Sequence, residues 1–141
     1  MSVFTDAEIA YMGRITLARL ATIGADGRPH VIPLTYHYNP DEDAIDIGGI
    51  DFASGKKWRD ANANPKVTLL VDDFDPPEAH ALEIRGDAEI RQTGGTKINP
   101  RFPNFVEPFI RLRPIHVVSW GLNEPVGQNP ADVPVSSRRV G

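Results

Sequence analysis

Hydrophobic and polar residues alternate with a period of two along much of this chain, a pattern typical of β-strands that bury one face. Between residues 82 and 92 the alternation is unbroken: apolar residues and Gly86 occupy one face, and charged residues occupy the other. Glycine has no side chain to pack, so we expect a bulge or bend at Gly86. Further strands are predicted at residues 15–23, 28–38, 44–49, 66–73 and 113–120.

Short polar segments mark the turns between these strands. Asp26-Gly27 is a dipeptide that favours a tight hairpin turn, so it should join the strands at 15–23 and 28–38. Residues 94–108 are rich in proline and glycine and should form a long loop, which in a small domain is usually functional or mobile.

Two short helices are expected. Thr5 and Glu8 have the spacing of a capping box, which predicts a helix that runs to about Tyr11. A second helix is predicted within residues 52–64.

Six strands with hairpin-type links and only short helices favour a mainly β fold. We expect a six-stranded antiparallel split β-barrel, because closing a barrel removes the exposed edges of an open sheet. This domain should span residues 1–122. Residues 123–141 have a turn-forming composition and no hydrophobic period, so they are predicted to be a C-terminal tail that packs on a partner or stays disordered.

The composition of the chain mainly indicates which partners and locations are not expected. The 141 residues are 40% hydrophobic with a net charge of -4, which fits one globular domain and disfavours nucleic acid as the main partner. There is no cysteine, and the histidines, at 30, 37, 80 and 116, lack the spacing of a zinc site, so no metal is expected. No apolar run approaches a membrane span and the N-terminus lacks a signal-peptide pattern, so we expect a soluble cytoplasmic protein.

Two adjacent lysines contrast with the acidic background. Lys56 and Lys57 are expected at the start of the second helix, where free backbone N–H groups and the helix dipole favour an anion. They follow Gly48-Gly49, which ends a predicted strand. The pair therefore indicates a phosphate site, with a solvated helix surface as the alternative.

Four segments, in this order and spacing, carry a resemblance to a known family. They are RLATIGADGRPHVIPLTYHYN (19–39), IDIGG (45–49), SGKKWRDANANPKVTLLVDD (54–73) and RPIHVVSWGL (113–122), with Lys57 eight residues before Pro65. The chain resembles the pyridoxamine-phosphate-oxidase-like split-barrel flavoproteins, and within them the branch that uses the deazaflavin coenzyme F-420. It has no Arg-x-His element after Trp120, the element with which the family's pyridoxamine phosphate oxidases grip substrate phosphate, and this departure argues against vitamin oxidation.

The resemblance implies where a coenzyme would lie. The residues that it assigns to cofactor binding are Lys56 and Lys57 at the phosphate, Pro33, Leu34 and Thr35 against the ring, and Gly48 and Gly49 beside the ring edge or the ribityl chain. Trp120 matches an aromatic position that often reaches the site of the other subunit, which implies a homodimer with cofactor sites at the subunit interface. From the residues alone, a plain turn at Gly48-Gly49 and a core position for Trp120 are the alternatives.

The implied activity is hydride transfer from reduced F-420 to a conjugated, electron-poor small molecule of the enone or quinone type. Two alternatives stay open, an FMN-binding flavoprotein oxidase or reductase and a non-catalytic cofactor-binding protein, because FMN and F-420 both present a ring, a ribityl chain and a phosphate. The coenzyme carries the chemistry, so no catalytic residue is assigned. Tyr36, His37 and Tyr38 are considered as proton donors, with packing or surface roles as the alternative.

Two further sets of residues follow from this interpretation. The acidic tail of F-420 would need cations near the pocket, and the candidates are Lys56, Arg59, Arg138 and Arg139, with solvated surface charge as the alternative. In the loop at 94–108, Phe102 and Phe105 are expected either to bind a flat acceptor or to close one end of the barrel.

Overall fold

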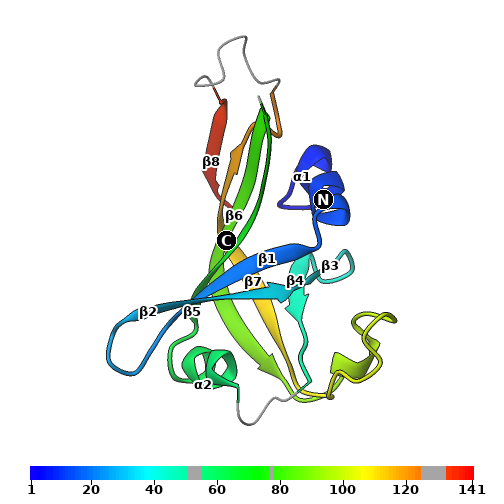
Figure 1. Cartoon of the computed structure of the whole chain (residues 1–141), viewed down its shortest axis with the longest axis vertical. Coiled ribbons are helices and arrows are strands. Elements are labelled where there is room, and N and C mark those ends of the chain that lie inside the picture. The colour runs from blue at the N-terminus through cyan, green and yellow to red at the C-terminus, as the bar shows by residue number, and fades with distance from the viewer. Residues whose placement is uncertain (51–54, 77, 125–132) are drawn as a thin grey trace.

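Strands dominate the fold, in agreement with the predicted mainly β class (Figure 1). The structure is a computed structural model that describes residues 1–50, 55–76, 78–124 and 133–141. In chain order its elements are α1 (Asp6–Arg14), β1 (Leu17–Ile23), β2 (Pro29–Thr35), β3 (His37–Asn39), β4 (Ala44–Ile47), α2 (Lys56–Ala63), β5 (Lys66–Asp75), β6 (Glu78–Arg91), the short 3-10 helix η1 (Gly95–Lys97), β7 (Phe109–Trp120) and β8 (Val135–Arg139).

The strands form one curled antiparallel sheet in the order β2-β1-β5-β6-β7-β4-β3. Strand β6 covers one edge of β7, and the other edge pairs with β4 around Leu112 and with β8 from His116 to Trp120. The two terminal strands of the order, β2 and β3, are joined through Tyr36 alone, so the sheet curls back on itself (Figure 1). This curled antiparallel sheet confirms the predicted split-barrel class.

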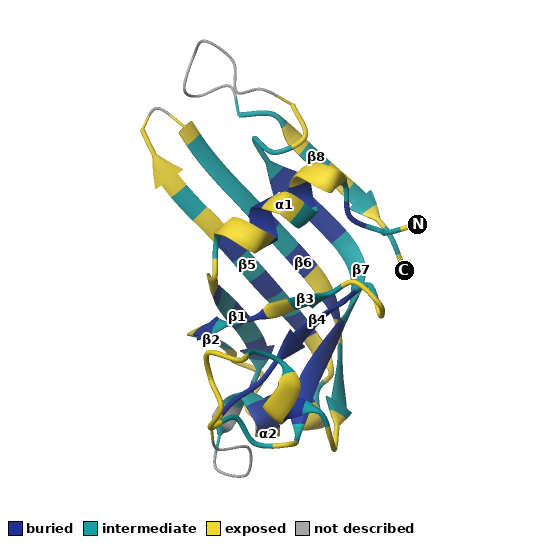
Figure 2. Cartoon of the chain, turned by 90° about the vertical axis from the view of Figure 1, so that its right-hand side faces the viewer, coloured by how far each residue is buried: buried dark blue, intermediate teal, exposed yellow. Residues whose placement is uncertain are grey.

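The core lies inside the curled sheet, and the two helices cover it from outside. Leu20, Leu69 and Ile84 come from neighbouring strands and are fully buried. Helix α1 lies over the part of the sheet that contains β8, and α2 lies at the opposite end (Figure 2). Helix α2 contributes Trp58, of which only 2% is exposed. The burial of this side chain in the core, rather than the composition of the helix itself, therefore stabilises α2. Among the described residues, no helix combines the length and apolarity needed to cross a membrane.

The predicted irregularity at Gly86 is confirmed. The register between β6 and β7 shifts between Arg85 and Gly86. A Cβ on Gly86 would lie 2.1 Å from the carbonyl oxygen of Arg113, so only glycine allows the two backbones to approach this closely.

The predicted capping box of α1 is also confirmed. The Thr5 hydroxyl accepts from the backbone N–H of Glu8, and the Glu8 carboxylate accepts from the backbone N–H of Thr5. The helix continues past Tyr11 to Arg14, because Tyr11 and Met12 pack into the core. The second predicted helix runs from Lys56 to Ala63, and residues 52–54 of that prediction lie outside the described residues.

The prediction of six strands was too low for the described part of the chain, which holds eight. One extra strand arises because β2 ends at Thr35, where the buried Tyr36 hydroxyl donates to the carbonyls of Met12 and Ile15 and the chain turns into β3. The other is β8, which lies in the segment predicted to be a C-terminal tail that packs on a partner or stays disordered. Its polar sequence has no hydrophobic period, and it is a strand because the free edge of β7 satisfies its backbone groups.

Candidate functional site

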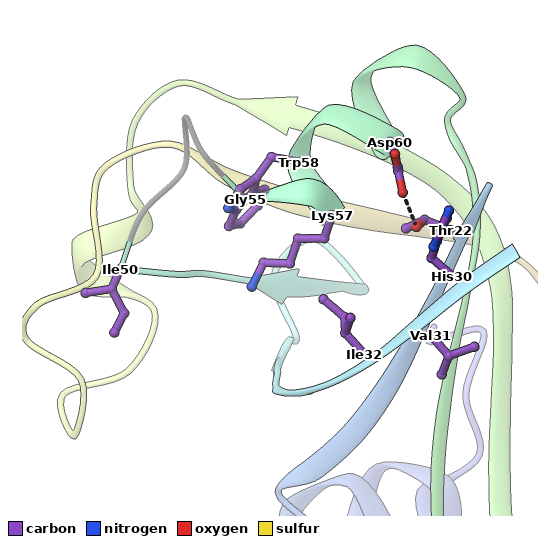
Figure 3. A pocket seen from close by; sticks show the side chains of 9 residues that line it. All are labelled: Thr22, His30, Val31, Ile32, Ile50, Gly55, Lys57, Trp58 and Asp60. Carbon is purple, nitrogen blue, oxygen red and sulfur yellow. Dashed lines mark hydrogen bonds between the residues drawn. The ribbon is translucent and has the colours of Figure 1, made fainter. Parts of the chain in front are cut away.

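A pocket of about 470 Å³ lies between α2 and the hairpin of β1 and β2 (Figure 3). Its walls come from three parts of the chain: the hairpin, the segment after β4, and α2. The lining residues are Thr22, His30, Val31, Ile32, Ile50, Gly55, Lys57, Trp58 and Asp60. Its size falls in the range of cofactor and small-molecule sites, which is roughly 300–1,000 Å³.

Lys57 extends into this pocket from the first turn of α2 (Figure 3). Its ammonium lies 4.8 Å from the centre of the Trp58 ring, and among the described residues it forms no ion pair. Burial lowers the pKa of Lys57 from its ordinary value, because the charged form loses hydration and gains no nearby carboxylate. A partly buried cation of this kind is stabilised by an anion that enters the pocket.

The start of α2 adds to the attraction for an anion. Gly55 is the N-cap residue and has no side chain to accept from the first turn, and that turn contains no acidic residue. The backbone N–H groups and the positive end of the helix dipole therefore act together with Lys57. The side chain of Lys56 lies outside the described part of the structure, so its predicted phosphate contact stays a prediction.

The two predicted glycines face different neighbours. A Cβ on Gly49 would lie 2.8 Å from the Trp58 ring and 3.5 Å from the Lys57 ammonium nitrogen, so Gly49 borders the same site. A Cβ on Gly48 would lie 2.5 Å from the ring of Phe105, in the loop at 94–108. Close packing therefore requires glycine at both positions, and Gly49 is the one beside Lys57.

The loop at 94–108 is fastened to this strand end. The backbone N–H of Val106 donates to the carbonyl of Gly49 at 2.9 Å. Phe102 stacks on Phe105 with ring centres 5.1 Å apart and planes 9° from parallel. Phe105 thus packs on the backbone of Gly48, while Phe102 stays 38% exposed and presents a flat ring at the surface.

The pocket also has a hydrogen-bonding end that the sequence analysis did not identify. The Thr22 hydroxyl donates to the Asp60 carboxylate at 3.0 Å, and both side chains are buried. His30, on β2, lies at the same end (Figure 3). One sequence signal could have found Asp60: it stands three residues after Lys57, which places both on one face of a helix.

The residues predicted to lie against the ring are next to the pocket and do not line it. Pro33, Leu34 and Thr35 follow Ile32 along β2. Pro33 is exposed, and Leu34 is buried in the core. The structure therefore places this stretch at the rim, where β2 leaves the pocket.

Trp120 is not brought together with Lys57 in a single chain. It lines a separate pocket of about 380 Å³ at the far ends of β5 and β7, with Phe74 and His80 among the other lining residues. Phe74 is 71% exposed there. The predicted contribution of Trp120 to a cofactor site can arise only between two chains.

The three side chains considered as proton donors lie outside the Lys57 pocket. The Tyr36 hydroxyl donates to backbone carbonyls, and burial raises the pKa of Tyr36. The Tyr38 hydroxyl donates to Asp43 at 2.7 Å. His37 is exposed and lines another pocket. In this structure the Tyr36 hydroxyl is therefore bonded to backbone and the Tyr38 hydroxyl to the Asp43 side chain.

Among the cations considered as partners of an acidic coenzyme tail, Arg138 already has another partner in the fold. Its guanidinium pairs with Glu8 and donates to the carbonyl of Val3, so this expectation is corrected. Arg59 and Arg139 are exposed and do not line the Lys57 pocket. Within the described ranges, no cluster of His, Cys, Asp and Glu side chains could hold a metal ion.

Comparison with known proteins identifies relatives that match most of the chain. Residues 5–98 match the family model described as pyridoxamine 5'-phosphate oxidase. A 5a,11a-dehydrotetracycline/5a,11a-dehydrooxytetracycline reductase of Streptomyces rimosus subsp. rimosus is 35% identical over 122 residues, which cover 84% of each protein.

Solved structures share the fold. A conserved hypothetical protein of Mycobacterium tuberculosis superposes with a TM-score of 0.68 at 22% identity, over 84% of this chain and 86% of that chain. An F-420 reductase superposes with a TM-score of 0.57 at 22% identity, over 77% of this chain and 93% of that chain. At these identities the structural similarity supports the split-barrel fold alone.

Proposed function

The chain belongs to the pyridoxamine 5'-phosphate oxidase family, and on that basis we propose that it is a reductase that uses the deazaflavin coenzyme F-420. The substrate in this proposal is a conjugated, electron-poor small molecule of the enone or quinone type. A relative at 35% identity named as a reductase of 5a,11a-dehydro compounds supports the reaction class. The F-420 reductase among the structural neighbours supports the coenzyme.

The observation that carries the proposal is the Lys57 ammonium, which is partly buried beside the start of α2 and has no acidic partner among the described residues. A coenzyme phosphate would supply the missing negative charge, and charge-assisted hydrogen bonds of this kind contribute about 1.5–3 kcal/mol each. Ile32 and Ile50 give the surrounding wall an apolar surface. The pocket therefore fits the phosphate and the adjoining chain of such a coenzyme.

When bound in its reduced form, a deazaflavin supplies a hydride. The residues of this chain would bind and orient the coenzyme and exclude water from it. We assign no proton donor, because the hydroxyls of Tyr36 and Tyr38 are bonded elsewhere.

We further propose that the protein acts as a homodimer with the coenzyme between two chains. Strand β2 is a terminal strand of the sheet, and its outward-facing residue Val31 is 64% exposed. Leu17, on the adjacent β1, is 49% exposed. Apolar side chains clustered on one face favour burial against a second molecule. Such a partner would also bring its Trp120 pocket to the Lys57 pocket, which one chain cannot do for itself.

The direct test is a fluorescence titration of the purified protein with F-420 and, separately, with FMN. Tight binding of F-420 and turnover of an enone or quinone with the reduced coenzyme are expected. Lys57→Ala should raise the dissociation constant for F-420 about 10- to 100-fold, whereas Lys66→Ala, at an exposed lysine of β5, should leave it unchanged. If Lys57→Ala folds normally and binds F-420 as tightly as the unaltered protein, the proposal is wrong.

Tighter binding of FMN than of F-420 would instead identify a flavoprotein. Binding of reduced F-420 without faster oxidation on adding an acceptor would identify a coenzyme carrier. Light scattering tests the dimer, which should have twice the 15.5 kDa mass of the chain.

A further inference from the structure

We infer that Trp58 is a positioning residue for the candidate site: the face of its ring holds the Lys57 ammonium at the place where an anion is to bind. The inference rests on the proposed function for the identity of that anion, whereas the contact between the two side chains belongs to the fold itself. It gives Trp58 a second role besides filling the core, in which only 2% of the residue is exposed.

The first argument is that this contact is unusual for neighbouring residues of a helix. Successive side chains leave an α-helix about 100° apart and do not face each other. Lys57 and Trp58 are successive residues of the first turn of α2, yet the Lys57 Nζ lies over the Trp58 ring, 4.8 Å from its centre. In Figure 3 the two side chains extend from α2 to the same side. The lysine is therefore folded across its neighbour's ring, within the roughly 6 Å over which a ring face attracts a cation.

The second argument is that the Trp58 ring is fixed from another side. A Cβ on Gly49 would lie 2.8 Å from the ring, so the ring packs directly on the backbone there. The carbonyl of Gly49 in turn accepts from the backbone N–H of Val106 at 2.9 Å. The same Cβ would lie 3.5 Å from the Lys57 Nζ, so the ring and the cation meet at one glycine. A buried ring packed on backbone is a rigid support for a lysine side chain, which is flexible by itself.

The third argument is the energetic state of the lysine. Burial lowers the pKa of Lys57, because the ammonium loses hydration, and the ammonium forms no ion pair with a described carboxylate. Among aromatic side chains, tryptophan attracts a cation most strongly, and the attraction grows where water is removed. The ring therefore holds the ammonium in place without neutralising its charge, as a carboxylate would. An arriving phosphate meets a cation that is already placed, so less conformational entropy is lost on binding.

The first experiment needs no ligand. The lysine amines are dimethylated with ¹³C-formaldehyde, and the Lys57 signal is identified by its absence from Lys57→Met. Protons above an aromatic face are shifted upfield, so the Lys57 methyl signal should lie upfield of that of Lys66, an exposed lysine of β5. The shift should disappear in Trp58→Leu and persist in part in Trp58→Phe, which keeps an aromatic face. A Lys57 signal at the position of the Lys66 signal would overturn the inference.

A double-mutant cycle then separates positioning from packing. Dissociation constants for F-420 are measured by fluorescence titration for the unaltered protein, Trp58→Leu, Lys57→Met and the double variant. Trp58→Leu should weaken binding about tenfold, and Trp58→Phe by less, because a desolvated cation–π contact is lost or reduced. In the Lys57→Met background the same change should have an effect of less than about twofold, because no ammonium remains to be held. An equal loss in both backgrounds would mean that Trp58 serves packing alone, and the inference would be wrong.

The proposed function and this inference fail separately. If F-420 does not bind the unaltered protein, the proposed function is wrong, and the ligand-free signal of Lys57 still decides whether Trp58 holds the ammonium. If Lys57→Met weakens F-420 binding and Trp58→Leu does not, the proposed function stands and this inference is overturned. Should Trp58→Leu fail to fold, Trp58→Phe takes its place in the cycle, and the Lys57 signal of the unaltered protein needs no Trp58 variant.

Discussion

Two regions of this protein bury charge in opposite ways. At the junction of α1 and β8, Glu8 is fully buried, and its carboxylate accepts hydrogen bonds from Arg138, from the backbone N–H of Thr5 and from Asn123. In the pocket beside α2, Lys57 is partly buried; its ammonium lies against the ring of Trp58 and forms no ion pair among the described residues. A buried charge with its own partner holds the fold together, whereas one without a partner is left for a ligand.

The largest effect is expected from Arg138→Ala, which would leave the buried Glu8 carboxylate without its cation. Removing one member of a buried ion pair costs about 3–5 kcal/mol, and the value here should lie at the lower end because 29% of the Arg138 side chain is exposed. The free energy of unfolding, measured with urea, should fall accordingly. Arg139→Ala, at the next and exposed residue of β8, is the control and should change it by less than about 0.5 kcal/mol. A small effect of Arg138→Ala would mean that the ion pair of Arg138 and Glu8 does not stabilise the fold.

The junction should also show in the dependence of stability on pH. Burial by itself would raise the pKa of Glu8, but hydrogen bonds from Arg138, Thr5 and Asn123 lower it below the ordinary 4.5. A carboxyl with a depressed folded pKa contributes stability above its unfolded value, and the contribution is lost as the pH falls through the folded pKa. The free energy of unfolding should therefore decline as the pH drops below about 4.5, and this decline should be weaker in Arg138→Ala. Parallel curves for the two proteins would contradict the assignment.

The opposite behaviour is expected at Lys57. Lys57→Met keeps the apolar stem and removes a charge that burial disfavours, so the protein should be as stable as before or more stable, by up to about 1 kcal/mol. Its affinity for F-420 should nevertheless fall. Thermal melting and titration of the same sample measure both effects, with Lys66→Met as the exposed control. Loss of stability in Lys57→Met would show that the lysine serves the fold, as Arg138 does.

The smallest effect is expected at the exposed ring of Phe102, in the loop that is bonded to Gly49 through Val106. Phe102→Leu keeps an apolar side chain and removes the flat face, so the KM for a planar quinone should rise a few-fold, with the affinity for F-420 and the melting temperature unchanged. Phe102→Tyr keeps the ring and should retain the original KM. Phe105→Leu should instead reduce stability, because its ring packs on Gly48. If Phe102→Leu lowers the melting temperature with unchanged kinetics, the loop only closes the barrel.

Local patterns in the sequence predicted much of the fold because each depends on neighbouring residues. The capping box at Thr5 and Glu8 and the bulge at Gly86 were found where they were expected. Strand β8 was not predicted, because its reason for being a strand lies in the free edge of β7 and not in its own residues. The turn at Tyr36 was missed for a similar reason: its hydroxyl is bound by carbonyls of a segment more than twenty residues away.

The residues of the candidate site also divide into those that the sequence predicted and those that it did not. Lys57 and Gly49 were named from the sequence and lie side by side. Thr22, His30 and Asp60 were not named, since their shared position depends on the packing of α2 over the hairpin. Trp120 was named, but one chain leaves it in a separate pocket.

By itself, the sequence determined most of the strand pattern, the helix start at Thr5 and the lysines at the start of α2, because period, capping and charge are properties of short segments. The tertiary structure decided which buried charges have partners. Arg138 and Lys57 look alike in the sequence, as cations in polar stretches. Folding brings Glu8 to Arg138 across more than a hundred residues, whereas Lys57 forms no ion pair with a described carboxylate. Since the free energy of a buried charge depends on what surrounds it in space, only the folded chain distinguishes a structural cation from one available to a ligand.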